Sequence, residues 1–276
     1  MFLTEHQCSC PAPLPSCDKP LSLSLGQAIF LFAAAVLGGA LNAVAGGGSF
    51  IGFPALLFTG IPPIPANATN TVALWTGVAA SSGAYRDRLN LPRRILIPLL
   101  GTSMAGGMAG AILLLKTPAH TFMRVLPWLM LAATVLFILG KKLAGRRELS
   151  AAHEVTPGTI AGASVFLFFV AVYGGYFGGG MGIVILAMLT AAGMADMHDM
   201  NALKSLLSSA VNAFAVIAFI VARAVYWRQA LVMIVGALIG GYFGAKYAQR
   251  LPALWVRWFV ILVGTGMTMY FFVKAY

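Results

Sequence analysis

Long apolar stretches separated by short polar connectors run through most of the chain. The stretches with almost no charge are Ala28–Ala45, Ile95–Leu115, Val125–Gly140, Ile160–Phe177, Val211–Ala222, Ala230–Gly244 and Trp258–Val273. Counted with their flanks, several of them reach the roughly 20 residues that a helix needs to cross about 30 Å of hydrocarbon. The pattern therefore predicts an all-α polytopic membrane protein with about 8–10 membrane segments.

The same order of segments occurs twice along the chain. Each half starts with a long apolar stretch, Leu23–Ala45 or Gly158–Phe177, that leads into three consecutive glycines. A shorter apolar piece follows, Phe50–Phe58 or Ile183–Ala191, and at 1.5 Å per residue it is too short to cross a bilayer. Three longer helices are expected to complete each half: Asn67–Tyr85, Ile95–Lys116 and Phe122–Gly140, and then Asn201–Arg223, Gln229–Lys246 and Trp255–Val273.

Short motifs of the first half return in the second half at one constant shift. The matched pairs are Asn67–Asn70 with Asn201–Lys204, Arg94 with Arg228, Gly106–Gly110 with Gly240–Gly244, and Lys116–Pro118 with Arg250–Pro252. We interpret them as two homologous halves, with a polar tail at 1–20, a first repeat at 21–145, a basic connector at 146–157 and a second repeat at 158–276. Such duplications are typical of secondary transporters, whose substrate site lies between the repeats.

The short piece after each glycine run decides how the two repeats are oriented. If it adds a crossing, each half crosses the membrane an odd number of times and the repeats are inverted; if it continues the first helix, the repeats are parallel. We favour inverted repeats, because the helix before each glycine run is already long enough to span. The turn Gly60–Pro65 is expected to be extended, since proline disfavours helix in the residue before it.

Charge adds information about orientation. Of the residues, 60% are hydrophobic and 9% are charged, whereas a soluble domain has about 25% charged residues. The net charge of +11 comes largely from basic residues in short connectors, which is typical of cytoplasmic membrane edges and argues against a nucleic-acid partner. We therefore expect Arg86–Arg94 and Lys141–Glu154 to face the cytoplasm and both termini to face outward.

No group of residues indicates an enzyme. The seven acidic residues and four histidines lie mainly in the tail and the connectors, and no Gly-x-x-x-x-Gly-Lys-Ser/Thr phosphate-binding loop is present. Cys8, Cys10 and Cys17 all lie in the tail, where a metal site with His6 and a disulfide with one free thiol both stay open. We expect a mobile tail, no cofactor and no bound metal.

The two glycine runs are the best indication of a binding site. Non-helical backbone at membrane depth is tolerated only where protein buries it or where it lines an aqueous cavity. Polar residues begin the helix after each short piece, and a helix N-terminus attracts anions. Lys204 is one of them; a lysine at membrane depth indicates function, and snorkelling to the interface is the open alternative. The predicted anion site comprises Gly46, Gly47, Gly48, Ser49, Asn67, Asn70, Gly178, Gly179, Gly180, Asn201 and Lys204.

A second set of glycines has a different interpretation. Gly106 and Gly110, like Gly240 and Gly244, have the small-xxx-small spacing that lets two membrane helices approach closely. We expect these four residues to serve helix packing and not substrate binding.

The first glycine run belongs to a longer pattern. Its parts are Gly38–Ser49 (Gly-Gly-x-Leu-x-Ala-x-Ala-Gly-Gly-Gly-Ser), Phe53–Leu57, a Gly-Ile-Pro-Pro turn, the helix start Asn67–Asn70 and, in the second half, Tyr173–Ile183 and Asn201–Ser205. The pattern resembles the TauE/SafE family of sulfite exporters and organosulfonate permeases over most of the chain after the tail. Met181 departs from it, because the first half has Ser49 after its glycines.

The resemblance implies a secondary transporter in the bacterial inner membrane for a small oxyanion, sulfite or an organosulfonate, with export favoured over uptake. The expected partners are the anion, the lipid bilayer and a coupled proton or other ion, and a homodimer stays open. The alternatives are an anion channel and a membrane accessory protein that does not transport. Selectivity by rings of charges or carbonyls usually uses symmetric subunits, which favours the transporter.

Overall fold

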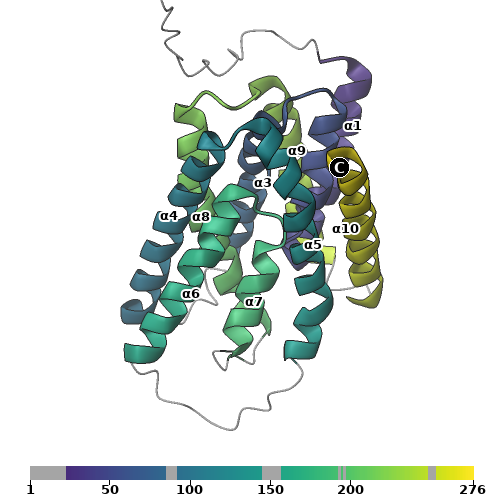
Figure 1. The fold of residues 1–276 in the computed structure, drawn as a ribbon. Coiled ribbons are helices and arrows are strands. Elements are labelled where there is room, and N and C mark those ends of the chain that lie inside the picture. Colours follow the sequence, from purple (N-terminus) through teal and green to yellow (C-terminus); the bar gives the residue numbers. More distant parts are fainter. Residues whose placement is uncertain (1–22, 85–91, 145–156, 192–193, 195–196, 248–252) are drawn as a thin grey trace, which may run out of the picture.

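Ten α-helices make up the part of the chain that the structure describes (Figure 1). The structure is a computed structural model that describes residues 23–84, 92–144, 157–191, 194, 197–247 and 253–276. The cysteine-containing tail 1–20 and almost all of the connector 146–157 lie outside the described residues. The helices are α1 (Leu25–Ala45), α2 (Ser49–Phe58), α3 (Pro63–Ala84), α4 (Arg93–Lys116), α5 (Ala119–Ala144), α6 (Pro157–Tyr176), α7 (Met181–Ala191), α8 (Met197–Val221), α9 (Trp227–Tyr247) and α10 (Ala253–Ala275).

Both predicted breaks at the glycine runs are confirmed. A long helix ends just before each run, and a short helix of 10 residues (α2) or 11 residues (α7) begins just after it. At 1.5 Å per residue these short helices measure roughly 15 Å, about half of the hydrocarbon thickness. In Figure 1, α7 covers only the lower part of the bundle, beside α6 and α5.

Caps at both ends of α1 explain where this helix starts and stops. The Ser24 hydroxyl accepts a hydrogen bond from the Gln27 backbone N–H, and the Gln27 side chain accepts one from the Ser24 N–H. This reciprocal pair is a capping box, which satisfies two of the free N–H groups at a helix start. At the other end Gly46 has a φ of 74°, the left-handed conformation that glycine adopts without a steric penalty.

The expectation of an extended segment at Gly60–Pro65 is wrong. Helix α3 begins at Pro63 and includes Pro65 in its first turn. A proline in the first turn loses no hydrogen bond, because the first four N–H groups of a helix have no intrahelical partner. The prolines therefore start the helix, and only the residues before Pro63 form the turn.

The two halves of the chain interleave in the bundle. Helix α1 packs mainly against α9, and α4 packs mainly against α6. The largest helix contacts therefore join a helix of one half to a helix of the other. Helix α3 contacts both α8 and α9, and α5 pairs with α10. In Figure 1 the start of α1 and the end of α10 lie at the upper end of the bundle, whereas α5 ends and α6 begins at the lower end.

The outer surface of the bundle is apolar. Large side chains such as Leu25, Trp258, Leu262 and Val273 are between 63% and 85% exposed. Soluble monomers rarely expose contiguous apolar surface on this scale, whereas lipid covers it in a membrane. Three helical segments of the described residues meet the length and hydropathy of a membrane span on their own: Leu25–Ala43, Arg93–Lys116 and Asp199–Val221.

An aromatic cluster holds the short helix α2 in place. The ring of Phe53 in α2 lies 6.1 Å from Phe122 of α5, 6.0 Å from Phe177 after α6 and 6.1 Å from Phe271 of α10. All four rings are fully buried. Two of the three contacts are edge-to-face, an arrangement that adds roughly 0.5–1.5 kcal/mol to the burial of each pair.

Glycines allow the interleaved helices to touch through their backbones. A Cβ atom on Gly107 of α4 would lie 2.2 Å from the Val211 carbonyl oxygen of α8, and one on Gly240 of α9 would lie 2.0 Å from the Val36 carbonyl oxygen of α1. Gly106, Gly110 and Gly244 face neighbouring backbone in the same way. These contacts support the packing interpretation of the small-xxx-small glycines.

Two glycines of α4 provide a matched test of this packing. We expect Gly107→Ala to lower the thermal unfolding temperature in detergent by several degrees, because the new methyl group overlaps the Val211 carbonyl and forces α4 and α8 apart. Gly101→Ala is the control, since a Cβ there meets nothing within 4 Å. Equal unfolding temperatures for the two variants, measured by differential scanning fluorimetry, would contradict the close approach.

Candidate functional site

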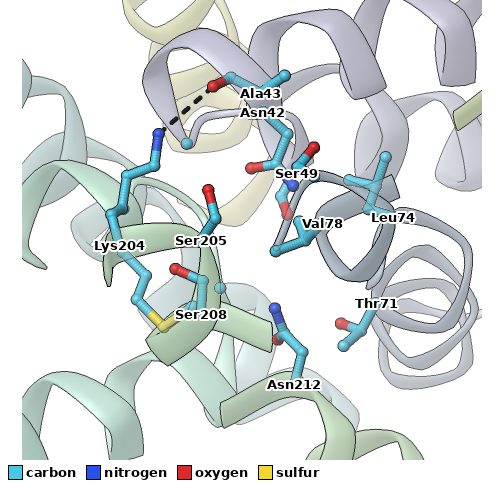
Figure 2. A pocket seen from close by; sticks show the side chains of 15 residues that line it. Asn42, Ala43, Ser49, Thr71, Leu74, Val78, Lys204, Ser205, Ser208 and Asn212 are labelled. Atoms are coloured by element: carbon cyan, nitrogen blue, oxygen red, sulfur yellow. Dashed lines mark hydrogen bonds between the residues drawn. The ribbon is translucent and has the colours of Figure 1, made fainter. Parts of the chain in front are cut away.

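A small cavity lies between the two glycine breaks. Its volume is about 30 Å³, roughly the room that two water molecules need by the same measure. Figure 2 shows the side chains around it, which come mainly from α1, α2, α3, α7 and α8. The lining residues are Asn42, Ala43, Gly46, Ser49, Thr71, Leu74, Val78, Ser81, Gly178, Met181, Gly182, Lys204, Ser205, Ser208 and Asn212.

The two breaks meet at this cavity without any side chain between them. A Cβ on Gly46 would lie 2.8 Å from the Cα of Gly182, and one on Gly182 would lie 3.0 Å from the Cα of Gly46. Gly46 and Gly178 both have a φ in the left-handed region, 74° and 78°, where side chains other than that of glycine are strained. Glycine is therefore required here for its backbone conformation and for the close approach.

Polar side chains of α8 form one wall of the cavity. Ser205, Ser208 and Asn212 follow one another at intervals of three and four residues, so that they lie on the same face of the helix. Across the cavity lie Asn42 of α1 and Ser49 of α2 (Figure 2). The hydroxyl and amide groups of these residues can donate hydrogen bonds to a small polar ligand.

Lys204 is the basic residue of the cavity lining. The residue is only 3% exposed, and its side-chain nitrogen Nζ donates to Asn201 Oδ1 at 3.0 Å. Nζ also donates to the Ala43 carbonyl oxygen at 3.4 Å (Figure 2). The Ala43 carbonyl is one of the last four of α1, which have no intrahelical partner and carry a partial negative charge. None of the residues that line the cavity is Asp or Glu.

The predicted asparagines of α3 are buried but do not line the cavity. Asn67 donates through Nδ2 to the Tyr176 carbonyl at 3.0 Å, which ties α3 to the end of α6. Asn70 donates to the Ser49 hydroxyl at 3.1 Å and so positions a residue that does line it. The Oδ1 atoms of both asparagines have no hydrogen-bond partner among the described residues.

The prediction that Asn67 and Asn201 lie at the start of a helix is wrong. Asn67 and Asn201 are each the fifth residue of their helix, because α3 begins at Pro63 and α8 at Met197. Only the first four N–H groups of a helix are free. The helix starts that do reach the cavity are those of α2, at Ser49, and of α7, at Met181 and Gly182.

The cavity brings together part of the predicted site. Gly46, Ser49, Gly178 and Lys204 line it, and Asn201 contacts it through the lysine. The other four predicted glycines do not line the cavity. A Cβ on each would meet protein atoms: on Gly47 the Phe50 ring, on Gly48 the Gly38 carbonyl, on Gly179 the Phe177 ring and on Gly180 Ala133.

The cavity lining also contains Asn42, Ser208 and Asn212, which the site predicted from the sequence does not include. The positions of Ser208 and Asn212 continue a polar stripe from Lys204 along an otherwise apolar helix, and this spacing of four residues was a usable signal. Asn42 had no such signal, because it is an isolated polar residue in α1.

The chain is similar to known membrane transporters. The pattern of the sulfite exporter TauE/SafE family matches residues 31–271, nearly the whole described bundle. The chain is 31% identical over 244 residues to the probable membrane transporter protein ORF9 of Sinorhizobium sp, covering 87% of this chain and 90% of that protein. It is 26% identical to a probable membrane transporter protein of Haemophilus influenzae, covering 90% and 95% of the two chains.

A third relative also bears the name of a probable membrane transporter. The chain is 27% identical over 245 residues to the probable membrane transporter protein YfcA of Escherichia coli K12, covering 86% of this chain and 87% of that protein. No solved structure matches the chain. With its apolar outer surface, its helical spans and its match to these bacterial proteins, the chain is a multi-pass integral membrane protein and not an enzyme. It belongs to the sulfite exporter TauE/SafE family of membrane transporters.

Proposed function

We propose that the protein is a secondary transporter that carries a small oxyanion, sulfite or an organosulfonate, through the cavity between the two glycine breaks, with export favoured. The observation that carries this proposal is the buried Lys204, whose charge has no carboxylate among the residues that line the cavity. A buried cation without a counter-ion costs several kcal/mol, and a bound anion removes that cost. The family match supports an anionic substrate.

The groups around Lys204 suit an oxyanion. Ser205, Ser208 and Asn212 offer donors on one wall. The first residues of α2 and α7 also line the cavity, so the partial positive charge of two helix N-termini lies in the same region. Leu74 and Val78 give the opposite wall an apolar surface that suits the short carbon chain of an organosulfonate. The small volume favours an ion of a few heavy atoms.

We also propose that the two halves are inverted repeats, 21–145 and 158–276, with the cavity where they meet. Three helix contacts support this, because each has a counterpart in the other half. In this pairing α1 to α5 correspond to α6 to α10. The contact of α1 with α9 then matches that of α6 with α4, and the contact of α3 with α9 matches that of α8 with α4. The contact of α2 with α10 matches that of α7 with α5. The opposite directions of the halves in Figure 1 fit inversion and not a parallel repeat.

The experiment that tests the function is flux of a substrate panel into proteoliposomes. The panel contains sulfite, thiosulfate, sulfoacetate, lactate and sulfate. We expect saturable flux of sulfite or the sulfonate, competition between them and little flux of lactate. Flux that rises without saturation and passes at channel rates would favour the anion channel, and no flux of any anion would favour an accessory role.

Replacement of the lysine tests the anion site. We expect Lys204→Met to weaken anion binding by about 2 kcal/mol or more, roughly 30-fold in Kd, because it removes the charged partner of a buried ion pair. Binding is measured as the anion-dependent rise in unfolding temperature. Lys116→Met, at the exposed end of α4, is the control and should bind as the wild type does. Wild-type affinity in a well-folded Lys204→Met protein would contradict the charge assignment.

Orientation in the membrane can be tested with single cysteines. In a background that lacks Cys8, Cys10 and Cys17, we expect cysteines at Ala151 and Tyr276 to react with a membrane-impermeant maleimide from opposite sides, since inverted halves place the connector and the C-terminus on different faces. The connector should be protected in intact cells and should react in inside-out vesicles. Labelling of both positions from the same side would exclude inverted repeats.

A further inference from the structure

We propose that Lys204 carries the coupling proton of the transport cycle and that the protein needs no sodium ion. The lysine binds a proton together with the oxyanion on one side of the membrane and releases both on the other side. One proton then moves with each monovalent anion, in the same direction, so export of the anion requires an outward anion gradient that exceeds the opposing proton gradient. This inference rests on the proposed function, because it concerns the cavity that binds the anion.

The hydrogen bonds of Lys204 suit a neutral amine. An ammonium group has three N–H donors, and loss of one proton leaves two. Within the described residues Nζ donates two hydrogen bonds, to Asn201 Oδ1 at 3.0 Å and to the Ala43 carbonyl at 3.4 Å. The neutral amine therefore has one acceptor for each N–H. The ammonium has one donor in excess, which an oxyanion in the cavity can accept.

Charge balance supports the same cycle. Helices α1, α2, α3 and α7, which surround the cavity together with α8, contain no titratable side chain in their sequences. When the anion leaves, a protonated Lys204 is a buried charge without a counter-ion, which is unfavourable. Release of the proton removes this charge. The loaded cavity and the empty cavity are then both close to neutral, so that neither carries a net charge across the membrane.

The tyrosines that pack near α8 do not change this balance. Helix α6 contains Tyr173 and Tyr176, and both hydroxyl groups are engaged outside the cavity. Tyr173 donates to the Gly179 carbonyl, and Tyr176 donates to the Thr117 hydroxyl at 3.5 Å.

The charged residues of the neighbouring segments lie away from the cavity. Those of α4 occupy its two ends, with Arg93 and Arg94 exposed at its start and Lys116 at its end. Asp199 lies in the first turn of α8, five residues before Lys204, and it does not line the cavity. Lys204 is therefore the titratable group of the lining.

The place of the Lys204 nitrogen argues against sodium. In transporters with broken helices, carbonyl groups at the end of a half-helix coordinate the coupling sodium ion. Here the equivalent carbonyl end is that of α1, and the Ala43 oxygen already accepts a hydrogen bond from Nζ. A cation that is part of the protein thus occupies the position of the free ion, and its charge can change only by gain or loss of a proton.

The test uses the full chain in liposomes, with methanesulfonate as the probe and a pH-sensitive dye inside. Methanesulfonate is the anion of a strong acid, so any proton that accompanies it is carried by the protein. We expect uptake to acidify the interior, to proceed equally in sodium and choline buffers, and to be unaffected by a potential set with potassium and valinomycin. An interior more alkaline by one pH unit should raise the accumulated anion about tenfold, the ratio of the proton concentrations.

The Lys204→Arg variant keeps the positive charge at this position but prevents release of the proton, so it tests the two roles of the lysine separately. A guanidinium keeps its proton under all accessible conditions, so this variant should still bind the anion and exchange internal for external anion. Net uptake driven by the pH gradient should fall at least about tenfold. Lys116→Arg is the matched control at the exposed end of α4 and should behave as the wild type.

Each outcome has a distinct meaning. Absence of both methanesulfonate and sulfite flux under every gradient would overturn the proposed function and this inference with it. Flux without internal acidification, or flux that requires sodium, would leave the function standing and overturn the inference. The wild-type dye measurement decides this even if Lys204→Arg does not fold. Gradient-driven net uptake by a folded Lys204→Met protein would show that another group carries the proton.

Discussion

The backbones of two broken helices touch at Gly46 and Gly182, and the cavity depends on this contact. A Cβ on either residue would come within 3.0 Å of the other residue's backbone, so only glycine permits it. The contact brings the carbonyl end of α1 and the amide start of α7 to the same place, beside Lys204. Partial charges of opposite sign therefore meet in a region that lipid and apolar side chains otherwise surround. A larger residue at either position would separate these helix ends and open the cavity.

Packing of helices from one half against helices of the other brings the two breaks together. Because α1 packs on α9 and α6 packs on α4, neither half forms a unit by itself, and the breaks of the two halves face each other. Glycines such as Gly107 and Gly240 let these pairs approach through their backbones. Packing of this kind provides van der Waals contact in lipid, where the hydrophobic effect does not drive helices together.

Much of the fold could be predicted from hydrophobic pattern, because lipid imposes the same requirement on every spanning helix. The ten helices, the breaks and the packing role of the small-xxx-small glycines all follow from segment length and residue size. The proline turn was misjudged for a local reason, since Pro63 and Pro65 fall in the first turn of α3, where a missing N–H has no consequence. The start of a helix depends on which residues occupy its first turn, and the hydropathy of the segment does not indicate this.

The sequence by itself determined the class of protein and the two glycine breaks, and it singled out Lys204 as a candidate binding residue, because each follows from residue type at a given position. Only the tertiary structure decided which residues share a cavity with that lysine. Asn67 and Asn70 fit the pattern equally well, yet one binds the Tyr176 carbonyl and the other the Ser49 hydroxyl. Asn42 lines the cavity although nothing in its sequence neighbourhood distinguishes it. The direction of a side chain depends on the rotation of its helix against four or five others, and that rotation follows from packing contacts between residues far apart in the chain.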